Sequence, residues 1–143
     1  MSIYTKAIKK SAWVYHVPAS GCNNCDIELV DVLTPRFDVE RFGIKLVGSP
    51  RHAEALMITG PVSIHCRSRV QAAYKEVPKP CLVVCIGTCA VTMGIFKDAY
   101  SVGGPPDEVI REIDPDAKIV YIPGCPPKPE TIIAGVVKAL GTL

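Results

Sequence analysis

The sequence contains no apolar run that is long enough to cross a membrane. A transmembrane helix needs roughly 20 consecutive apolar residues, and no stretch of the 143 residues approaches that length. The first 17 residues, MSIYTKAIKKSAWVYHV, also lack the uninterrupted apolar block of a signal peptide. We therefore expect a chain with no transmembrane segment of its own, on the cytoplasmic side.

The sequence has no marked excess of one charge. Its 16 Lys and Arg residues nearly balance its 14 Asp and Glu residues, and the basic residues are spread along the chain instead of forming a run. A nucleic-acid-binding protein typically concentrates basic side chains into one patch or stripe. We therefore expect no nucleic-acid partner.

Glycine-rich phosphate-binding motifs are also absent. The sequence has neither a GxGxxG motif nor a P-loop, and the segment after the first predicted strand reads SGCNNC. Nucleotide and flavin sites usually hold their phosphates on such glycine-rich loops at the start of a helix. This absence argues against a nucleotide- or flavin-binding protein.

What is present is an alternation of strand-like and helix-like segments. Apolar residues make up 48% of the chain, enough for one compact domain over residues 1–143. Short apolar runs that end in Gly or Pro loops predict these strands: Ala12–Val17, Ala55–Thr59, Cys81–Ile86 and Lys118–Ile122. Helical spacing predicts these helices: 24–33, 62–77, 107–113 and 130–140.

This alternation predicts an α/β fold. Strands that alternate with helices form a mainly parallel sheet covered on both faces, which here gives a flavodoxin-like, three-layer fold with four strands. Residues 37–47 fit neither pattern, and we expect them to form an excursion between the first helix and the second strand.

Four of the seven cysteines directly follow predicted strands. Cys22 and Cys25 follow the first strand, Cys89 follows the third, and Cys125 follows the fourth. Parallel strands all end at one edge of the sheet, where such folds place their ligand sites, so these four thiols are expected to converge. Because a reducing compartment disfavours disulfides, each cysteine is either a core thiol or a metal ligand.

Four converging thiolates suit either zinc or an iron-sulfur cluster. Both accept ligation by cysteine alone, but structural zinc sites usually combine two close cysteine pairs. Here one CxxC pair is joined by two distant single cysteines. The spacing favours a cluster at the carboxyl edge of the strands and leaves a structural zinc-binding interaction domain as the alternative.

The other three cysteines are expected to be core thiols. Cys81 and Cys85 lie on one face of the third strand by its period of two, and free cysteine is among the most buried residue types. Cys66 is expected on the second helix. Cys85, four residues before Cys89, is the one plausible substitute ligand.

None of the three histidines is assigned to a metal. His16 ends the first strand, His52 precedes the second, and His65 is expected on the first turns of the second helix as a solvated or hydrogen-bonded side chain. The turn Thr59-Gly60-Pro61 follows the second strand at the same sheet edge. It either contacts the thiol site or serves only as a strand-to-helix turn.

Four segments, in order along nearly the whole chain, resemble one known family. GCNNCDIE, TGPVS, GTCA and PGCPPKPE are similar to segments of the small subunit that carries the proximal 4Fe-4S cluster in NiFe hydrogenases and respiratory complex I. PGCPP with the following Pro-Glu is the most specific of them. The resemblance implies that Cys22, Cys25, Cys89 and Cys125 bind one 4Fe-4S cluster.

The first segment resembles the hydrogenase branch of this family. Complex I subunits generally have two adjacent cysteines there, whereas energy-converting, membrane-bound hydrogenases commonly have GCNGCDIE. Asn24 stands where that group commonly has Gly. The chain stops at Leu143, without the C-terminal extension of uptake hydrogenases, which implies the short small subunit with a single cluster.

The resemblance implies an electron-transfer subunit of a membrane-bound, energy-converting NiFe hydrogenase complex. The cluster would carry electrons between a ferredoxin-like 4Fe-4S subunit and a NiFe-type large subunit, beside membrane subunits that translocate protons or sodium ions. The chain would be a peripheral subunit at the cytoplasmic face and not catalytic alone. The alternative is the same subunit in a complex I-like quinone or sulfur-compound oxidoreductase, because the nickel ligands that discriminate lie in the large subunit.

Glu28 is the candidate for proton transfer. It follows Cys25 by three residues, which places both on one face of the predicted helix. One interpretation is an acid that stabilises the positive end of the helix, a role that Asp26 fills at least as well. The other, which the resemblance implies, is a proton-relay carboxylate between the cluster and the large subunit.

Overall fold

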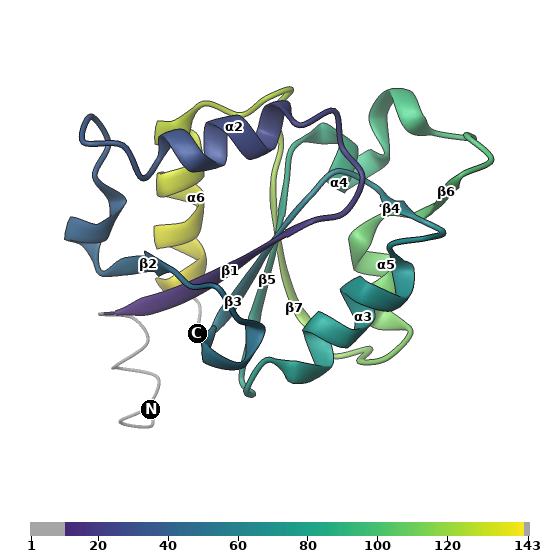
Figure 1. Ribbon diagram of the computed structural model, residues 1–143, viewed down its shortest axis with the longest axis horizontal. Coiled ribbons are helices and arrows are strands. Elements are labelled where there is room, and N and C mark those ends of the chain that lie inside the picture. The colour runs from purple at the N-terminus through teal and green to yellow at the C-terminus, as the bar shows by residue number, and fades with distance from the viewer. Residues whose placement is uncertain (1–10, 142–143) are drawn as a thin grey trace.

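A five-stranded parallel sheet forms the centre of the protein. The computed structural model describes residues 11–141, and the strand order across the sheet is β2-β1-β3-β5-β7 (Figure 1). Its members are β1 (Ala12–Pro18), β2 (Ile44–Leu46), β3 (Ala55–Thr59), β5 (Leu82–Ile86) and β7 (Lys118–Ile122). All four pairings between neighbours are parallel, which confirms the predicted α/β class.

The number of strands in the prediction was wrong by one. The segment expected to be an excursion contains β2, which pairs with β1 through Ala12↔Ile44 and two further positions. Ile44 is buried, while Lys45 and Leu46 are exposed. A three-residue edge strand with one buried side chain is too short to show a period of two, so its pairing with β1 defines it.

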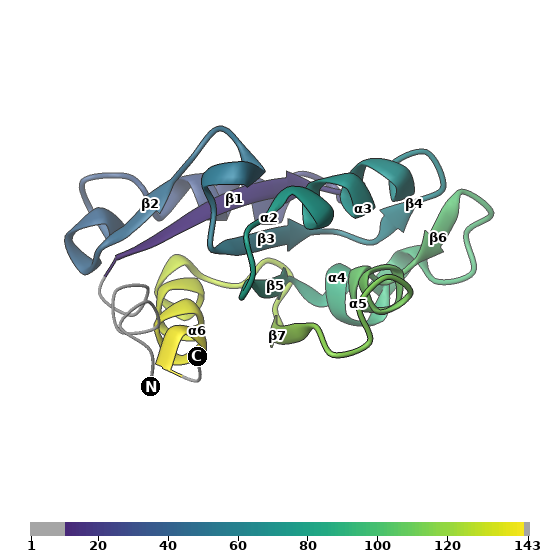
Figure 2. The same ribbon diagram turned by 90° about the horizontal axis from the view of Figure 1, so that it is seen from below.

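Helices cover both faces of the sheet. They are α2 (Asn24–Asp31), α3 (Arg67–Glu76), α4 (Thr88–Thr92), α5 (Pro106–Arg111) and α6 (Pro129–Gly141), with short 3-10 turns at Val39–Phe42, Pro50–His52 and Gly94–Phe96. Figures 1 and 2 show α2 and α6 on one side of the sheet and α3 and α5 on the other. The three predicted layers are therefore present. No helix within residues 11–141 is long and apolar enough to cross a bilayer.

The helix predicted over 62–77 begins later than expected, at Arg67. Its first two residues instead form β4 (Val62–Ser63), which pairs antiparallel with β6 (Val102–Gly104). Val62 is fully buried in the hydrophobic cluster on the α3 and α5 side of the sheet. This burial favours a short strand over a helical turn at that position. His65 consequently lies before the helix, exposed, and Cys66 is its N-cap residue.

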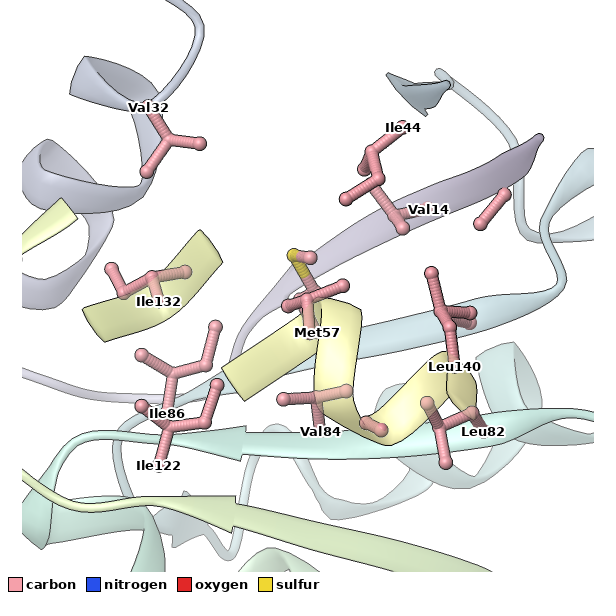
Figure 3. Close-up of a cluster of buried hydrophobic side chains, with 14 of the residues drawn as sticks. Val14, Val32, Ile44, Met57, Leu82, Val84, Ile86, Ile122, Ile132 and Leu140 are labelled. Atoms are coloured by element: carbon pink, nitrogen blue, oxygen red, sulfur yellow. The ribbon is translucent and has the colours of Figure 1, made fainter. Parts of the chain in front are cut away.

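The two central strands supply the core on both faces. Every residue of β3 and β5 is buried. Successive side chains alternate between two hydrophobic clusters, one on each face of the sheet. Met57, Val84 and Ile86 face α2 and α6 (Figure 3). Each such buried aliphatic side chain stabilises the fold by roughly 1.5–3 kcal/mol. This rigid centre fixes where the loops after the strands emerge.

Both cysteines predicted for the core of the third strand are buried. Cys81, which directly precedes β5, and Cys85 within it belong to the cluster that faces α3 and α5. Burial raises the pKa of Cys85 to about 12, with a smaller contribution from Asp107. Cys85 is therefore an inert core thiol and lies apart from the other cysteines of the sheet edge.

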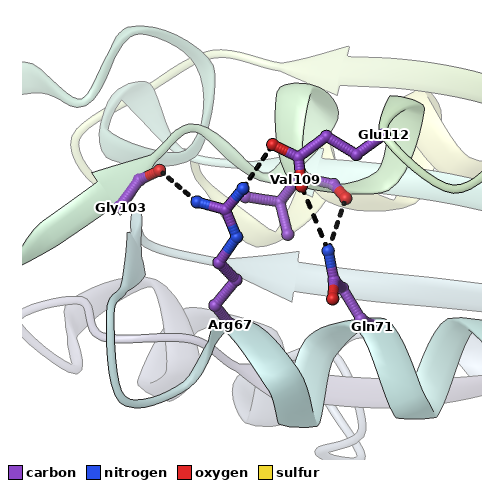
Figure 4. A network of polar contacts seen from close by, with 5 residues as sticks. All are labelled: Arg67, Gln71, Gly103, Val109 and Glu112. Atoms are coloured by element: carbon purple, nitrogen blue, oxygen red, sulfur yellow. Dashed lines mark hydrogen bonds and ion pairs between the residues drawn. The ribbon is translucent and has the colours of Figure 1, made fainter.

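Polar contacts hold α3, α5 and β6 together. The Arg67 guanidinium pairs with the Glu112 carboxylate and also donates to the carbonyl oxygen of Gly103 at 3.5 Å (Figure 4). Gln71 Nε2 donates to the Glu112 carboxylate at 3.2 Å and to the Val109 carbonyl oxygen at 3.4 Å. These contacts anchor the segment that returns to the sheet after α4.

Candidate metal centre

The four cysteines predicted as ligands all lie at the carboxyl edge of the sheet. Cys22 is exposed in the loop after β1, and Cys25 is half-buried in the first turn of α2. Cys89 is half-buried in α4, directly after β5, and Cys125 is exposed in the loop after β7. Both α2 and α4 begin at this edge, near the top of Figure 1. Three strands far apart in sequence thus deliver one group of thiols.

Cys25 and Cys89 lie near enough to the other thiols of this edge for their charges to interact. Burial raises the pKa of Cys25 to about 11, and the charges of Cys22, Cys89 and Cys125 each raise it further, as does Asp26. Burial also raises the pKa of Cys89, again with contributions from Cys125 and Cys22. Thiolates this close repel one another unless a cation lies among them, and metal binding would release their protons.

Two glycines allow the backbone to approach the sulfurs of Cys25 and Cys89. Gly87, the residue between β5 and α4, has φ +90, and a Cβ there would lie 2.5 Å from Cys25 Sγ. Gly94 has φ +49, and a Cβ there would lie 3.1 Å from Cys89 Sγ. Only glycine combines a positive φ with such a contact at low cost. The backbone is therefore shaped around the thiols.

The loops that carry Cys89 and Cys125 are joined directly. The backbone N–H and the hydroxyl of Thr88 donate to the carbonyl oxygen of Gly124 at 2.7 Å and 3.0 Å. The N–H of Gly87 donates to the Ile122 carbonyl oxygen at 2.8 Å. These bonds fix the separation of the two loops.

The predicted turn Thr59-Gly60-Pro61 packs against the loop of the CxxC pair. Ser20 Oγ donates to the Pro61 carbonyl oxygen at 2.5 Å, and a Cβ on Gly60 would clash with the backbone nitrogen of Gly21. Gly60 also has φ +76. The turn therefore supports the cysteine loop, and it lines the same small cavity as Cys22, Cys25 and Cys89.

A polar cluster that the sequence did not predict anchors the helix of Cys25. Thr59 Oγ1 donates to the Asp26 carboxylate at 2.5 Å, and His16 Nε2 lies 2.8 Å from the same carboxylate oxygen and 3.0 Å from Thr59 Oγ1. Thr59 is 1% exposed and is the one buried polar residue found among residues 11–141. Burial lowers the pKa of His16, while the charge of Asp26 and the contact with its side chain oppose that shift.

This cluster explains how α2 is held at the site. Its N-cap residue, Asn23, has φ +70 and makes no side-chain capping bond, so the first turn lacks the usual cap. Asp26 instead ties that turn to β1 and β3 through His16 and Thr59. The sequence does not indicate this contact, because His16 and Thr59 are 43 residues apart and meet only through strand pairing.

Glu28 lies one turn after Cys25 on α2 and is half-buried. Within residues 11–141 its carboxylate makes no side-chain hydrogen bond or ion pair, whereas Asp26 is the acid of the first helical turn and is bonded to Thr59. The helix-end role therefore falls to Asp26, and the carboxylate of Glu28 is left available for another role.

The donor set fits an iron-sulfur cluster. Four thiols on three loops lie at one edge of the sheet, and a 4Fe-4S cluster takes four cysteine ligands. Within the described residues, no three Cys, His, Asp or Glu side chains lie close enough to hold a single metal ion.

The fold and the thiol group define a class, an α/β protein with a four-cysteine site at the carboxyl edge of a parallel sheet. Residues 22–139 match the family described as NADH ubiquinone oxidoreductase, 20 Kd subunit, and the chain belongs to that family. The family was expected from the four segments around the cysteines, and this match confirms it.

Curated relatives come from several oxidoreductase complexes. The probable membrane-bound hydrogenase subunit mbhJ of Pyrococcus furiosus is 47% identical over 138 residues, which cover 96% of this chain and 79% of the relative. Formate hydrogenlyase subunit 7 of Escherichia coli is 46% identical over 138 residues, and an NADH-quinone oxidoreductase subunit of Rubrobacter xylanophilus is 37% identical over 135. The last two matches cover 96% and 94% of this chain but only 52% and 50% of those relatives. This chain is likewise a subunit of an oxidoreductase complex.

Solved structures agree with this fold. The membrane-bound sulfane sulfur reductase, described as an archaeal respiratory membrane complex, contains a chain that superposes with a TM-score of 0.76 at 32% identity, covering 98% of this chain and 74% of that one. A [NiFeSe] hydrogenase from Desulfovibrio vulgaris Hildenborough gives a TM-score of 0.66 at 22% identity, covering 92% of this chain and 60% of that one. The second similarity establishes only the shared fold.

Proposed function

We propose that the chain is the electron-transfer small subunit of a membrane-bound, energy-converting NiFe hydrogenase complex. It holds one 4Fe-4S cluster on Cys22, Cys25, Cys89 and Cys125 and passes electrons between a ferredoxin-like subunit and a NiFe-type large subunit. Membrane subunits that translocate ions complete the assembly, with this chain at the cytoplasmic face. The observation that carries the proposal is the convergence of four thiols from three loops.

The chain itself supplies ligation, burial and hydrogen bonds. The bound cluster accepts and donates single electrons, and its potential depends on solvent exposure and on donors to the sulfurs. Cys25 and Cys89 are half-buried, while Cys22 and Cys125 are exposed. One side of the group is therefore shielded by the protein, and the open side is available to a partner subunit.

The outer face of α2 supports a partner on that side. Ile27 and Val30 are exposed large apolar side chains on this helix, directly after the CxxC pair. Leu33 continues the same apolar face just past the helix end. An apolar stripe beside a ligand site is typical of a surface that another chain covers. We assign this face to the large subunit.

Glu28 is the proposed proton carrier of this subunit. It is half-buried beside Cys25, and it has no ion-pair partner among the described residues. A carboxyl group can accept and donate a proton, which is the chemistry of a proton relay.

The Glu28→Gln substitution tests this role. We expect unchanged iron content and hydrogen turnover slowed by roughly tenfold or more, since general acid-base groups contribute about 10²–10⁴-fold. Glu40→Gln, at an exposed position on the 3-10 turn after α2, is the matched control. Equal turnover rates in the two variants would remove the relay role.

A second candidate function is electron transfer in a sulfur- or quinone-reducing complex of the same architecture. The superposition on the sulfane sulfur reductase, at a TM-score of 0.76, supports it, as does the 37% identity to a quinone oxidoreductase subunit. The two functions share the cluster and differ in the large subunit.

Anaerobic purification of the complex through a tag on this chain separates the candidates. The hydrogenase function predicts a brown preparation with an EPR signal on reduction, nickel in the co-purifying large subunit, and hydrogen evolution from a reduced ferredoxin. Nickel-free preparations that reduce polysulfide or quinone would favour the second candidate. A colourless preparation with one zinc per chain would refute both.

A further inference from the structure

Two exposed apolar surfaces lie on opposite sides of α4, the helix that carries Cys89. One is the outer face of α2, and the other lies around the ends of β4 and β6 (Figures 1 and 2). Ile95 and Tyr100 in the second surface are 88% and 96% exposed, the two highest values among the large apolar side chains of residues 11–141. Exposed apolar side chains beside a ligand site are typical of a surface that another chain covers. We define the β4–β6 surface by these residues: Ile64, Arg69, Ile95, Lys97 and Tyr100.

Backbone contacts hold the β4–β6 surface in place. The Ile64 N–H donates to the Ser101 carbonyl oxygen at 2.9 Å, which brings Ile64 beside the segment of Tyr100. The strands β4 and β6 pair antiparallel, and the Arg67 guanidinium on α3 donates to the Gly103 carbonyl oxygen at 3.5 Å (Figure 4). The exposed side chains are therefore displayed on a fixed backbone, which lowers the entropy cost of binding a partner.

The same surface lies beside a proposed ligand. Gly94 has φ +49, and a Cβ there would lie 3.1 Å from Cys89 Sγ. Ile95 is the next residue, and Lys97 directly follows the 3-10 turn Gly94–Phe96. A protein that covers Ile95 therefore comes close to the sulfur of Cys89. Electron transfer becomes faster as two redox centres approach each other, so this position suits an electron-exchange partner.

The two apolar surfaces differ in charge. Residues 22–33, which include α2, contain three acids and no Lys or Arg. The segments 63–69 and 93–101, which carry the β4–β6 surface, contain three Lys or Arg residues and one acid, Asp98. Because like charges that face each other are unfavourable, a partner surface that is complementary to one of the two is not complementary to the other.

Two of the three basic side chains are available to a partner. Arg67 pairs with Glu112. Arg69 and Lys97 are exposed, and neither forms an ion pair with another group of residues 11–141. The β4–β6 surface therefore combines exposed apolar side chains with unpaired positive charge, which fits an acidic protein surface.

We propose that the β4–β6 surface docks an acidic protein that carries a redox centre, the ferredoxin-like subunit of the complex, on the Cys89 side of the site. The large subunit then covers α2, so the two partners approach from opposite sides of α4. The inference rests on the proposed function, because it needs a redox-active group on the four thiols. Electrons pass one at a time between the partner's centre and that group, so one is reduced as the other is oxidised, and no bond forms or breaks.

Photo-cross-linking inside the intact complex tests this assignment. Tyr100→p-benzoylphenylalanine and Ile27→p-benzoylphenylalanine place the same probe on the two surfaces, at positions that are both exposed. The tagged complex is purified anaerobically and irradiated, and mass spectrometry identifies the linked peptides. We expect position 100 to be linked to the subunit whose sequence has ferredoxin-like cysteine motifs, and position 27 to the large subunit. Linkage of position 100 to the large subunit, a membrane subunit, a lipid or a second copy of this chain overturns the inference, and so does the absence of any linkage there.

Charge reversal tests the electrostatic part of the proposal. Arg69→Glu combined with Lys97→Glu should lower the amount of ferredoxin-like subunit that stays bound through a salt wash by roughly tenfold or more, because the new acids face an acidic partner. Lys118→Glu combined with Lys138→Glu makes the same charge change at exposed positions on β7 and α6 and should leave that amount unchanged. Equal retention in the two double variants overturns the inference. Iron analysis separates the two levels, since a wild-type chain that holds zinc and no cluster refutes the proposed function itself, whereas an iron-loaded chain linked to another partner at position 100 refutes only the docking site.

Discussion

Polar and sulfur-containing side chains have different surroundings at the two edges of the central sheet. At the amino edge, Tyr74 donates to the Asp114 carboxylate at 2.5 Å, and Lys79 donates to Cys81 Sγ at 3.4 Å. The Lys79 ammonium also lies 3.2 Å from the centroid of the Tyr74 ring. Each group at this edge is satisfied by another group of the same chain.

At the carboxyl edge the four thiols have no such side-chain partners within residues 11–141. The pKa of Cys25 and that of Cys89 are raised by burial and, to a smaller extent, by the charges of the neighbouring thiols. Glycines leave room around these two sulfurs. Cys81 and the four edge cysteines are chemically identical. The comparison shows that Cys81 is buried beside a cationic side chain, whereas the four proposed ligands lie on loops and first helical turns after the strands.

The largest difference between the edges should appear on removing one thiol from each. We expect Cys125→Ala to lose most of about four irons per chain, because it removes one of the four thiolates proposed to hold the cluster and Cys125 lies on the exposed side of the site. Cys81→Ala should keep its iron and lose only about 1 kcal/mol of stability from lost packing. Iron and sulfide analysis checks both variants, and an equal loss of iron in the two would break the comparison.

A smaller effect is expected from filling the space around a sulfur. A methyl group at Gly87 would lie 2.5 Å from Cys25 Sγ at φ +90, which costs roughly 1–3 kcal/mol in backbone strain. We expect Gly87→Ala to lower both the melting temperature and the iron content. Gly48→Ala is the control, since a Cβ there meets no atom within 4 Å. Iron retention at the wild-type level in Gly87→Ala would show that the thiols do not need this space.

The smallest effects come from removing one hydroxyl at each edge. Thr59→Val leaves Asp26 and His16 with fewer partners, and Tyr74→Phe removes the donor to Asp114. Each loses about 1 kcal/mol of stability, somewhat more for Thr59 because its site is buried. Thermal unfolding should show both losses. Only Thr59→Val should also change the EPR line shape of the cluster, and an identical change in Tyr74→Phe would contradict the separation of the edges.

Much of the fold could be predicted because its signals are local. The apolar runs of β3, β5 and β7 end in Gly or Pro turns, and the observed bounds agree within a residue or so. The short edge strand β2 and the pair of β4 with β6 were missed, because two or three residues carry no periodicity. These elements are stabilised by strand pairing and by the burial of Val62 and Ile44, and not by the local propensity of their residues.

The site likewise has features that the sequence predicts and features that depend on folding. That four cysteines follow strands is visible in the sequence, and parallel topology then implies one edge for all of them. The contact of His16, Thr59 and Asp26 depends on strand pairing, and the approach of Gly94 to Cys89 Sγ depends on backbone geometry. No spacing in the sequence indicates either of them.

The sequence alone thus determined the class of fold, the candidate ligands and the family, because apolar periodicity and the order of cysteine-containing turns are properties of the chain. Only the tertiary structure decided that Cys85 is buried in the core, that Asp26 and not Glu28 anchors α2, and that the backbone at Gly87 and Gly94 approaches the sulfurs of Cys25 and Cys89. The physical reason is distance. These outcomes depend on contacts that strand order and positive φ angles create, and such contacts form only when the chain folds.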